Sequence, residues 1–600
     1  MGNIMNLTAV RNKPSRNGFD LSQKINFTAK VGELMPVWWT PVLPTDSLRV
    51  QVNNFIRTQS LNSAAFARMR GYFDFYFVPF SQMWQHFNTA VTQMNTNLQY
   101  ASGPVISDNK ALSGQLPYFT CEQVAKYIIS LGQKKNAFGF FRSTMTCRLL
   151  EYLGYGNFYP YDPNGSQKWT WDEHPMLNNL ALSPFPLMAY QKIYADYNRY
   201  TQWERTNPST FNMNYITGNG DLNLDLLVSG FTDTFNFFDL RYSNWQKDLF
   251  HGVLPVAQYG EASVVPLGGE MSVIPESTDV SSPIFTAHQD VDGQYVGLQR
   301  REGTPGYNLV GIDNNTLLTW NSSGLKVSAA TNSFSLSILA LRRAEAAQKW
   351  KEVSLASEED YPAQIGAHWG EKPSDFLSGM CRYLGGITSN LDINTITNTN
   401  LADDNAALQR ATGTFNAAGG IKFDSAGQYG IVMCVFRALP ILDYTTTGVY
   451  FGATLTDVTD FPIPEFDRIG MESVPVCRAL NPALETPSSP PIKADAYFGY
   501  APRYIDWKTA IDVSRGEFTN TLESFVMKFN DDDLFAADSV DYPDNPNVEA
   551  DSIKAGFFKV NPHTVDTLFA VDADKADHLL CSTFFDVKVV RSLDTNGLPY

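Results

Sequence analysis

The sequence predicts a mainly β protein, and three observations carry this prediction. Apolar and polar residues alternate in several short runs, as they do on a strand with one buried face. One run, QYGIVMCVFRALPIL (428–442), is almost continuously apolar, which is typical of a strand covered on both faces. Stretches with helical periodicity are few.

The clearest alternating strand lies in ARMRGYFDFYFVPFSQMW (67–84). Phe73, Phe75 and Phe77 share one face, and Pro79 ends the strand because proline cannot donate to a β ladder. Base stacking usually needs exposed rings beside basic side chains. Because no basic side chain enters this run, we expect the three phenylalanines to lie in the core.

Two further segments predict strands. Residues 24–44 begin with alternation and end in a proline-punctuated Trp38–Trp39 pair. Residues 582–593, STFFDVKVVRSL, place Phe585 and the valines that follow it on one face.

Residues 337–357 are the best predicted helix, and residues 81–93 predict a shorter one. The longer segment has one apolar stripe at helical spacing: Leu339, Ala346, Trp350 and Val353. Arginines and a lysine border this stripe. We favour a helix that packs by its Ala/Trp face; a basic ridge facing DNA is the alternative.

Composition limits the class of protein. The chain has 600 residues, of which 18% are charged and 13% aromatic, and its net charge is −17. Low charge with many rings suggests a surface largely covered by other chains. The six cysteines form no CxxC pair, so we expect free thiols in a reducing compartment. We find no secretory signal and no apolar run long enough for a membrane span.

Motifs for catalysis or metal binding are missing. The seven histidines are dispersed, and the chain has no HExxH, Walker or GxSxG motif. The stretch VDADKADH (571–578) lacks the central glycine and the distal glutamate of a calcium loop. We therefore expect no enzyme activity, no cofactor and no metal site.

The leading part of the chain is basic although the whole is acidic. Residues 1–70 carry nine Lys and Arg against three Asp and Glu. We expect a basic N-terminal arm, 1–23, to contact an anion. The candidate nucleic-acid-binding residues are Arg11, Lys13, Arg16 and Lys24. The alternative is a solvated N-terminus with scattered charges.

Several blocks then carry a family resemblance: RNGFDLSQKINFTAKVGELMPVWWTPVLPTDSLRV, SAAFARMRGYFDFYFVPFSQMWQHFN, DLRYSNWQKDLFHGVLPVAQYG, LSILALRRAEAAQKWKE, FGYAPRYIDWKTAIDVSRGEF and HLLCSTFFDVKVVRSLDTNGLPY. In this order they resemble the major capsid proteins of the Microviridae, small phages with circular single-stranded DNA. The gokushovirus-like lineages, including those associated with Bacteroidetes, are the most similar.

The resemblance implies an eight-stranded antiparallel jelly roll with long insertions between strands and a few short helices. Residues 1–600 would form one capsid domain. Residues 260–333, with eight acids against three bases, would be an outward-projecting insertion. Residues 100–180 and 390–420 would be further variable insertions.

It also implies a function. The chain would be the major capsid protein of a virion, assembled in the bacterial cytoplasm into a T=1 icosahedral shell around single-stranded DNA. Its partners would be copies of itself, the genome, minor phage proteins and a host receptor. The alternative is a secreted or surface β-sandwich glycan-binding protein or glycosidase, with a sugar platform at Trp38–Trp39 or in the tyrosine-rich segment 190–204.

Overall fold

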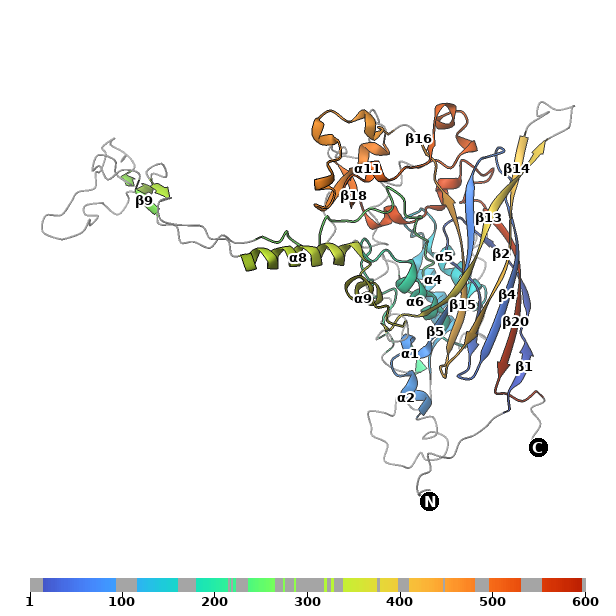
Figure 1. The fold of residues 1–600 in the computed structure, drawn as a ribbon. Coiled ribbons are helices and arrows are strands. Elements are labelled where there is room, and N and C mark those ends of the chain that lie inside the picture. Colours follow the sequence, from blue (N-terminus) through green and yellow to red (C-terminus); the bar gives the residue numbers. More distant parts are fainter. Residues whose placement is uncertain are drawn as a thin grey trace, which may run out of the picture. The chain divides into compact units, whose positions relative to one another are not determined.

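A large curled β-sheet organises the computed structural model (Figure 1). The structure describes residues 15–92, 116–159, 180–213, 216, 220–222, 236–264, 338–374, 378–397, 409–445, 448–480, 496–529 and 553–595, together with short strands at 273–275, 285–287, 318–320 and 325–327.

Nine antiparallel strands form this sheet: β1 (Asn17–Asp20), β2 (Gln23–Ala29), β3 (Met35–Val42), β4 (Ser47–Thr58), β5 (Arg68–Pro79), β13 (Arg382–Thr397), β14 (Gln409–Asp424), β15 (Gly430–Ile441) and β20 (Leu579–Arg591). Their order is β1-β20-β4-β14-β13-β5-β15-β3, and β2 also pairs with β20. We call β2, β20, β4 and β14 the open half, and β3, β15, β5 and β13 the covered half. The two halves join where β13 pairs with β14.

Aromatic rings join the inner faces of the two halves. Trp38 of β3 stacks on Phe585 of β20 with ring centroids 5.6 Å apart. The rings of Phe77 on β5 and Phe423 on β14 are 4.6 Å apart. The sheet therefore curls until its two halves pack face to face around one core. The sequence-predicted core residues Phe73, Phe75 and Phe77 are at most 3% exposed.

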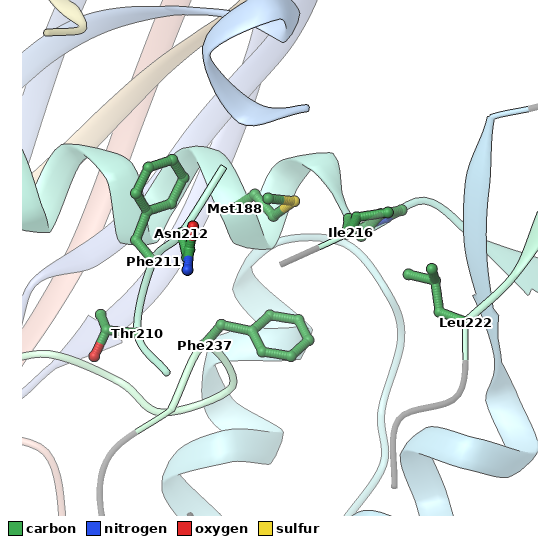
Figure 2. A pocket seen from close by; sticks show the side chains of 8 residues that line it. Met188, Thr210, Phe211, Asn212, Ile216, Leu222 and Phe237 are labelled. Carbon is green, nitrogen blue, oxygen red and sulfur yellow. The ribbon is translucent and has the colours of Figure 1, made fainter. Parts of the chain in front are cut away.

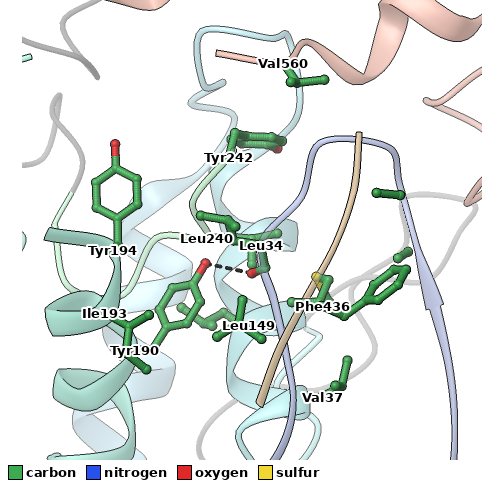
Figure 3. Packing of buried hydrophobic residues seen from close by; sticks show 14 of the residues in the cluster. Leu34, Val37, Leu149, Tyr190, Ile193, Tyr194, Leu240, Tyr242, Phe436 and Val560 are labelled. Carbon is green, nitrogen blue, oxygen red and sulfur yellow. Dashed lines mark hydrogen bonds between the residues drawn. The ribbon is translucent and has the colours of Figure 1, made fainter. Parts of the chain in front are cut away.

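Helices cover the outer face of the covered half. The main ones are α5 (Arg142–Tyr152), α6 (Phe185–Ile193) and the π-helical turn η4 (Tyr194–Asn198). All nine residues of α6 are buried, and α6 contacts both β5 and β15. Figure 3 shows this packing, including the Tyr190 hydroxyl that donates to the Leu34 carbonyl at 2.8 Å.

Local sequence explains how this helical layer is anchored. α4 (Cys121–Leu131) begins at a capping box in which Thr120 and Gln123 satisfy each other's backbone N–H groups. It packs on α5, and α5 packs on β3. Arg148 of α5 donates to Glu33 at 3.0 Å and to Asp577 at 2.8 Å. A buried ion-pair network thus ties this insertion to the sheet.

Smaller elements complete the main unit. The helices are α1 (Phe80–Met83), α2 (Phe87–Thr92), α9 (Tyr361–Trp369) and α11 (Ile505–Lys508). The short strands are β6 (Pro117–Thr120), β7 (Ala181–Leu182), β8 (Gly220–Asp221), β16 (Tyr444–Thr445), β17 (Met471–Pro475), β18 (Tyr497–Pro502) and β19 (Val513–Ser514). The 3₁₀ turns are η6 (Phe451–Ala453), η7 (Val458–Asp460), η8 (Pro464–Phe466), η9 (Val476–Arg478), η10 (Gly516–Thr519), η11 (Glu523–Phe525), η12 (Ala555–Phe558) and η13 (Pro562–Val565).

Residues Gly260–Lys351 form a separate compact unit. It contains two strand pairs, β9 (Val273–Pro275) with β12 (Leu325–Val327) and β10 (Phe285–Ala287) with β11 (Leu318–Trp320). It also contains most of α8 (Ile338–Ala356). Most of the predicted insertion 260–333 lies outside the described residues.

The structure both confirms and corrects the sequence analysis. The predicted strands in 24–44, 67–84, 428–442 and 582–593 are present, and the helix predicted over 337–357 spans Ile338–Ala356. The expectation that this helix packs by its Ala/Trp face is wrong. Among its described side chains only Leu355 is buried, and Trp350 is 55% exposed. Apolar periodicity marks a face but does not show what covers it.

The predicted insertions 100–180 and 390–420 have different structures from each other. The range 100–180 supplies β6, α4 and α5, with 93–115 and 160–179 outside the described residues. The range 390–420 is largely sheet, because its two ends lie in β13 and β14 and pair with each other.

Candidate nucleic-acid interface

No described helix packs on the outer face of the open half. Burial alternates strictly along β4, from Leu48 to Thr58, so that every second side chain points to solvent. β20 alternates in the same way from Leu579 to Val590. By contrast β15 is buried almost throughout. The open face therefore presents its side chains freely.

A row of three cations crosses this face. Arg49 on β4 pairs in register with Lys422 on β14 and with Lys588 on β20. Neighbouring strands lie about 4.8 Å apart, so the three side chains start within roughly 10 Å of one another. Among the described residues, neither Arg49 nor Lys422 has a carboxylate partner. The row can therefore attract an anion such as phosphate.

Lys588 differs from the other two because acids flank it. Its ammonium contacts Asp20 of β1 and lies 3.2 Å from Asp586. The hydrogen bonds from Lys588 and Ser22 hold the pKa of Asp20 below its usual range. The hydrogen bond to Asp20 in turn raises the pKa of Lys588. The excess positive charge of the row thus lies at Arg49 and Lys422.

Two phenylalanines are exposed further along the same face. Phe55 on β4 is 40% exposed and Phe584 on β20 is 43% exposed. They are diagonal neighbours, because Phe55 lies opposite Ser582, two residues before Phe584. The guanidinium of Arg57 lies 5.1 Å from the Phe55 ring centroid, and Lys24 lies opposite Phe584. Exposed rings beside cations are the features that bind unpaired bases and their phosphates.

The residues predicted for nucleic-acid binding have separate positions. Arg11 and Lys13 lie outside the described residues. Arg16 donates to the Thr45 carbonyl at 2.5 Å and to Ser47 at 3.3 Å, at the start of β4. Lys24 is exposed on the open face itself. The structure thus places two of the four next to the cation row or the exposed rings.

Sequence reasoning missed the rest of this surface. The alternation that places Phe585 on one face of its strand also places Phe584 and Lys588 on the other, a step that the sequence analysis did not take. The signal was available for β20 and for β4. It could not show that Arg49, Lys422 and Lys588 share one row, because only the strand register brings them together.

The alternative sugar platforms are not exposed. Trp38 is 3% exposed, and the Trp39 indole donates to the Leu153 carbonyl at 3.0 Å. Tyr190 and Tyr194 of the tyrosine-rich segment are at most 2% exposed. Trp38, Tyr190 and Tyr194 are core residues and Trp39 is partly buried against the core, so the structure offers no support for a glycan-binding role at either place.

Two other features offer no candidate site. Figure 2 shows an apolar cavity beside Met188, Phe211 and Phe237; its volume of about 10 Å³ is close to that of one water molecule. In the segment 571–578, Asp572 pairs with Lys575 and Asp577 with Arg148. Among the described residues, no group of three His, Cys, Asp or Glu could hold a metal ion.

Comparison with known proteins identifies the family of this chain. A family model described as "Capsid protein (F protein)" matches residues 8–122 and 170–600. The chain belongs to this capsid protein family. It is also similar to the capsid protein VP1 of the Bdellovibrio phage phiMH2K, with 21% identity over 597 residues that cover 98% of this chain and 95% of that protein.

Membership confirms the Microviridae resemblance seen in the sequence. This capsid protein is a structural component of the virion that assembles with copies of itself, and it is not an enzyme. Within the described residues, no helix is both long enough and apolar enough to span a membrane. The cavities and charged networks described above therefore belong to a subunit of a shell.

Proposed function

We propose that this capsid protein forms a T=1 icosahedral shell around a single-stranded DNA genome, and that the open face of its sheet contacts the DNA. The observation that carries the proposal is the combination of exposed Phe55 and Phe584 with the cation row on one uncovered face. The chain as a whole has a net charge of −17, so a local cationic surface is needed to hold phosphates.

The strand order supports a jelly roll as the shell-forming domain. The open half has the order β2-β20-β4-β14 and the covered half β3-β15-β5-β13. Consecutive strands along the chain therefore fall mostly in opposite halves, as Greek-key connections require. Ring contacts such as Phe27 with Phe436, at 5.3 Å, close the two halves over the core. Eight strands arranged in this way make the proposed barrel, and residues 1–600 form one capsid domain around it with insertions between strands.

Unpaired DNA suits the open face better than a duplex. An exposed ring offers a stacking partner to any base, worth about 1–3 kcal/mol per base, and needs that base to be unstacked. Phosphates would lie at Arg49, Lys422 and Arg57. Exposed Gln51 and, opposite it, Asp586 lie between the rings and the cation row, and the Gln51 amide can bond to base edges.

The N-terminal arm would extend this surface. Arg16 contacts Ser47, two residues from Arg49 on the same strand. The arm, 1–23, therefore joins the sheet close to the cation row. Arg11 and Lys13 would contribute further phosphate contacts from there, in a way that needs no sequence recognition.

Other partners follow from the same role. Minor phage proteins and a host surface receptor are expected contacts of a capsid in this family, and assembly would take place in the host cytoplasm. The acidic range 260–333 suits an outward-projecting insertion, since its charge disfavours DNA. Residues 100–180 and 390–420 remain candidates for variation between relatives, and the family match leaves out 123–169.

The double variant Phe55→Ala/Phe584→Ala tests the DNA-binding face. Both rings are exposed, so particles should still assemble, but they should contain less DNA or release it at lower salt. The ratio of absorbance at 260 and 280 nm, with DNA release measured across a salt series, reports this. Tyr361→Ala, which removes an exposed ring outside the sheet, is the matched control. Normal DNA content and retention in the double variant would contradict the proposal.

A further inference from the structure

A second cluster of exposed rings lies away from the sheet face. We call exposed Tyr450, Phe461, Phe466 and Trp507, together with half-buried Phe451, the aromatic patch. Tyr450 is 67% exposed, Phe461 50% and Trp507 45%. Val458, Ile469 and Val513 nearby are also exposed. So many apolar side chains in one region exceed what a free monomer usually leaves in water.

The rings of the patch hold one another in place. Trp507 lies edge-on to Phe451 with centroids 5.2 Å apart, and Phe461 is 6.1 Å from Trp507. Phe451 also contacts Tyr450 at 4.7 Å. These contacts restrict the side chains before any partner arrives, which lowers the entropy cost of binding.

Polar contacts fix the backbone beneath the rings. Tyr504 has a left-handed φ of 61°, which is rare for a residue with a side chain, and it begins the short helix α11 that carries Trp507. The Tyr504 hydroxyl accepts from the Ile463 N–H at 3.3 Å. Lys508 of α11 pairs with Asp467. A strained backbone that is held from two sides presents Trp507 in a defined position.

The patch borders a hollow of about 320 Å³. Tyr450, Phe451 and Trp507 line it together with Arg478 and Arg515. Arg478 is bound to Asp506 at 3.1 Å and to Thr454 at 3.0 Å, whereas among the described residues no carboxylate pairs with exposed Arg515. A ring-lined hollow with an arginine at its edge can receive a protruding side chain, as binding hot spots do.

We propose that the aromatic patch is an interface between subunits, covered by a neighbouring copy of this chain in the shell. The inference rests on the proposed shell and adds to it the surface that the contact uses. A copy is the partner that every subunit meets. Asp506 neutralises Arg478 in the hollow, but Arg515 at its edge has no carboxylate partner among the described residues, so an acidic side chain of the neighbouring copy can pair with it.

The same features disfavour a sugar as the occupant. Sugar recognition needs polar groups that are free to bond to hydroxyls, but Arg478 and Asp506 already bond to each other. The exposed apolar side chains also extend well beyond the hollow, to Val458 and Ile469. A broad apolar surface around a central aromatic anchor is typical of a protein–protein contact.

Hydroxyl-radical footprinting tests the proposal on the whole chain. Oxidation of Trp507 and Tyr450 is measured by mass spectrometry in purified particles and in subunits released from them. We expect at least about tenfold slower oxidation of both residues in particles. Trp84, which is 0% exposed, is the internal reference and should be protected in both samples. Equal oxidation of Trp507 in particles and subunits would overturn the proposal.

Variants test whether the patch contributes to assembly. Trp507→Ala should fold, as judged by its thermal transition, but should need about tenfold more protein to assemble, as the loss of a hot-spot residue implies. Trp507→Phe, which keeps a ring, should assemble at a lower concentration than Trp507→Ala. If Trp507→Ala particles form at the wild-type concentration, the proposal is wrong. Should Trp507→Ala fail to fold, the wild-type footprint alone decides.

The footprint also separates this proposal from the DNA proposal. Protection of Trp507 that appears only when minor phage proteins are present would assign the patch to one of those proteins and contradict a contact between copies. Particles that protect Trp507 but bind no DNA would instead contradict the proposed role of the open face. Tyr361→Ala should assemble normally in either case, since Tyr361 lies in α9, outside both surfaces.

Discussion

The two halves of the curled sheet share one core but differ on their outer faces. In the covered half, β5 is buried on both faces from Phe73 to Pro79, because α6 and η4 pack over it. In the open half, β4 alternates between buried and exposed residues along its whole length. The inner faces of both halves are buried in the shared core. The halves therefore differ in whether an insertion covers the outer face.

This difference shows where the chain can meet a partner. The outer face of the covered half holds polar groups that are satisfied within the chain, such as Asp74, whose carboxylate lies 3.2 Å from Arg437. On the open half, Arg49 and Lys422 face outward without such partners among the described residues. A buried outer face serves stability, whereas an exposed face with rings and cations fits the proposed contact with DNA.

Replacing a ring inside the core should have the largest effect. Phe75→Ala removes a fully buried ring, and such changes typically cost about 3–5 kcal/mol of a total stability of about 5–15 kcal/mol. Urea denaturation of Phe75→Ala and Phe584→Ala subunits compares the inner face with the open face. Phe584→Ala should change the free energy of unfolding by less than about 0.5 kcal/mol. Equal losses in both variants would refute the distinction between the two faces.

Acid should act next most strongly, through Asp248 in the layer over the covered half. Burial by itself raises the pKa of Asp248, but the charge and hydrogen bonds of His251 and the hydroxyl of Tyr444 outweigh it and lower the pKa to about 2. The ordinary value in an unfolded chain is about 3.9. This carboxylate therefore stabilises the fold above about pH 4, and the stabilisation is lost as the pH falls through about 2.

Asp248→Asn should accordingly reduce the loss of stability between pH 4 and pH 2. Asp20→Asn on the open side is the comparison, because the Lys588 ammonium also lowers the pKa of that carboxyl. Asp20 depends chiefly on the exposed Lys588 ammonium, whereas Asp248 also accepts a hydrogen bond from the buried Tyr444 hydroxyl, so 1 M salt should weaken the contribution of Asp20 more than that of Asp248. Thermal unfolding at several pH values and two salt concentrations measures both. A loss of the Asp248 effect in salt as large as that of the Asp20 effect would contradict this distinction.

Removing the cation row should affect stability least of all. Arg49→Ala/Lys422→Ala should leave the unfolding free energy within about 0.5 kcal/mol, since both side chains are exposed. The slope of log affinity for single-stranded DNA against log salt should fall by about 0.7 for each phosphate that the variant no longer neutralises. Lys508→Ala, outside the sheet, is the matched control. An unchanged salt slope in the double variant would remove the row from the proposed interface.

The sequence predicted the strands better than their arrangement. The patterns around Phe73, Val432 and Phe585 are local, so β5, β15 and β20 could be located from them. Their pairing could not, because β20 lies beside β4, more than 500 residues earlier in the chain. The cation row depends on that pairing, which is why it was missed while the core phenylalanines were not.

Two further misses have a shared physical reason. The stripe on α8 and the Trp38–Trp39 pair were both judged by the side chains alone. Periodicity predicted the helix correctly, but Leu339 and Trp350 are exposed among the described residues. Trp38 shows the reverse, since a ring considered for sugar binding stacks in the core on Phe585. Whether a ring is exposed depends on elements far away in sequence.

A density map of DNA-filled particles tests the central claim most directly. The account predicts that the open face, with Phe55, Phe584 and Arg49, lies on the inner surface of the shell and that ordered nucleic-acid density covers it. The claim would be contradicted if this face lay on the outer surface, or if another subunit covered it and left no room for DNA.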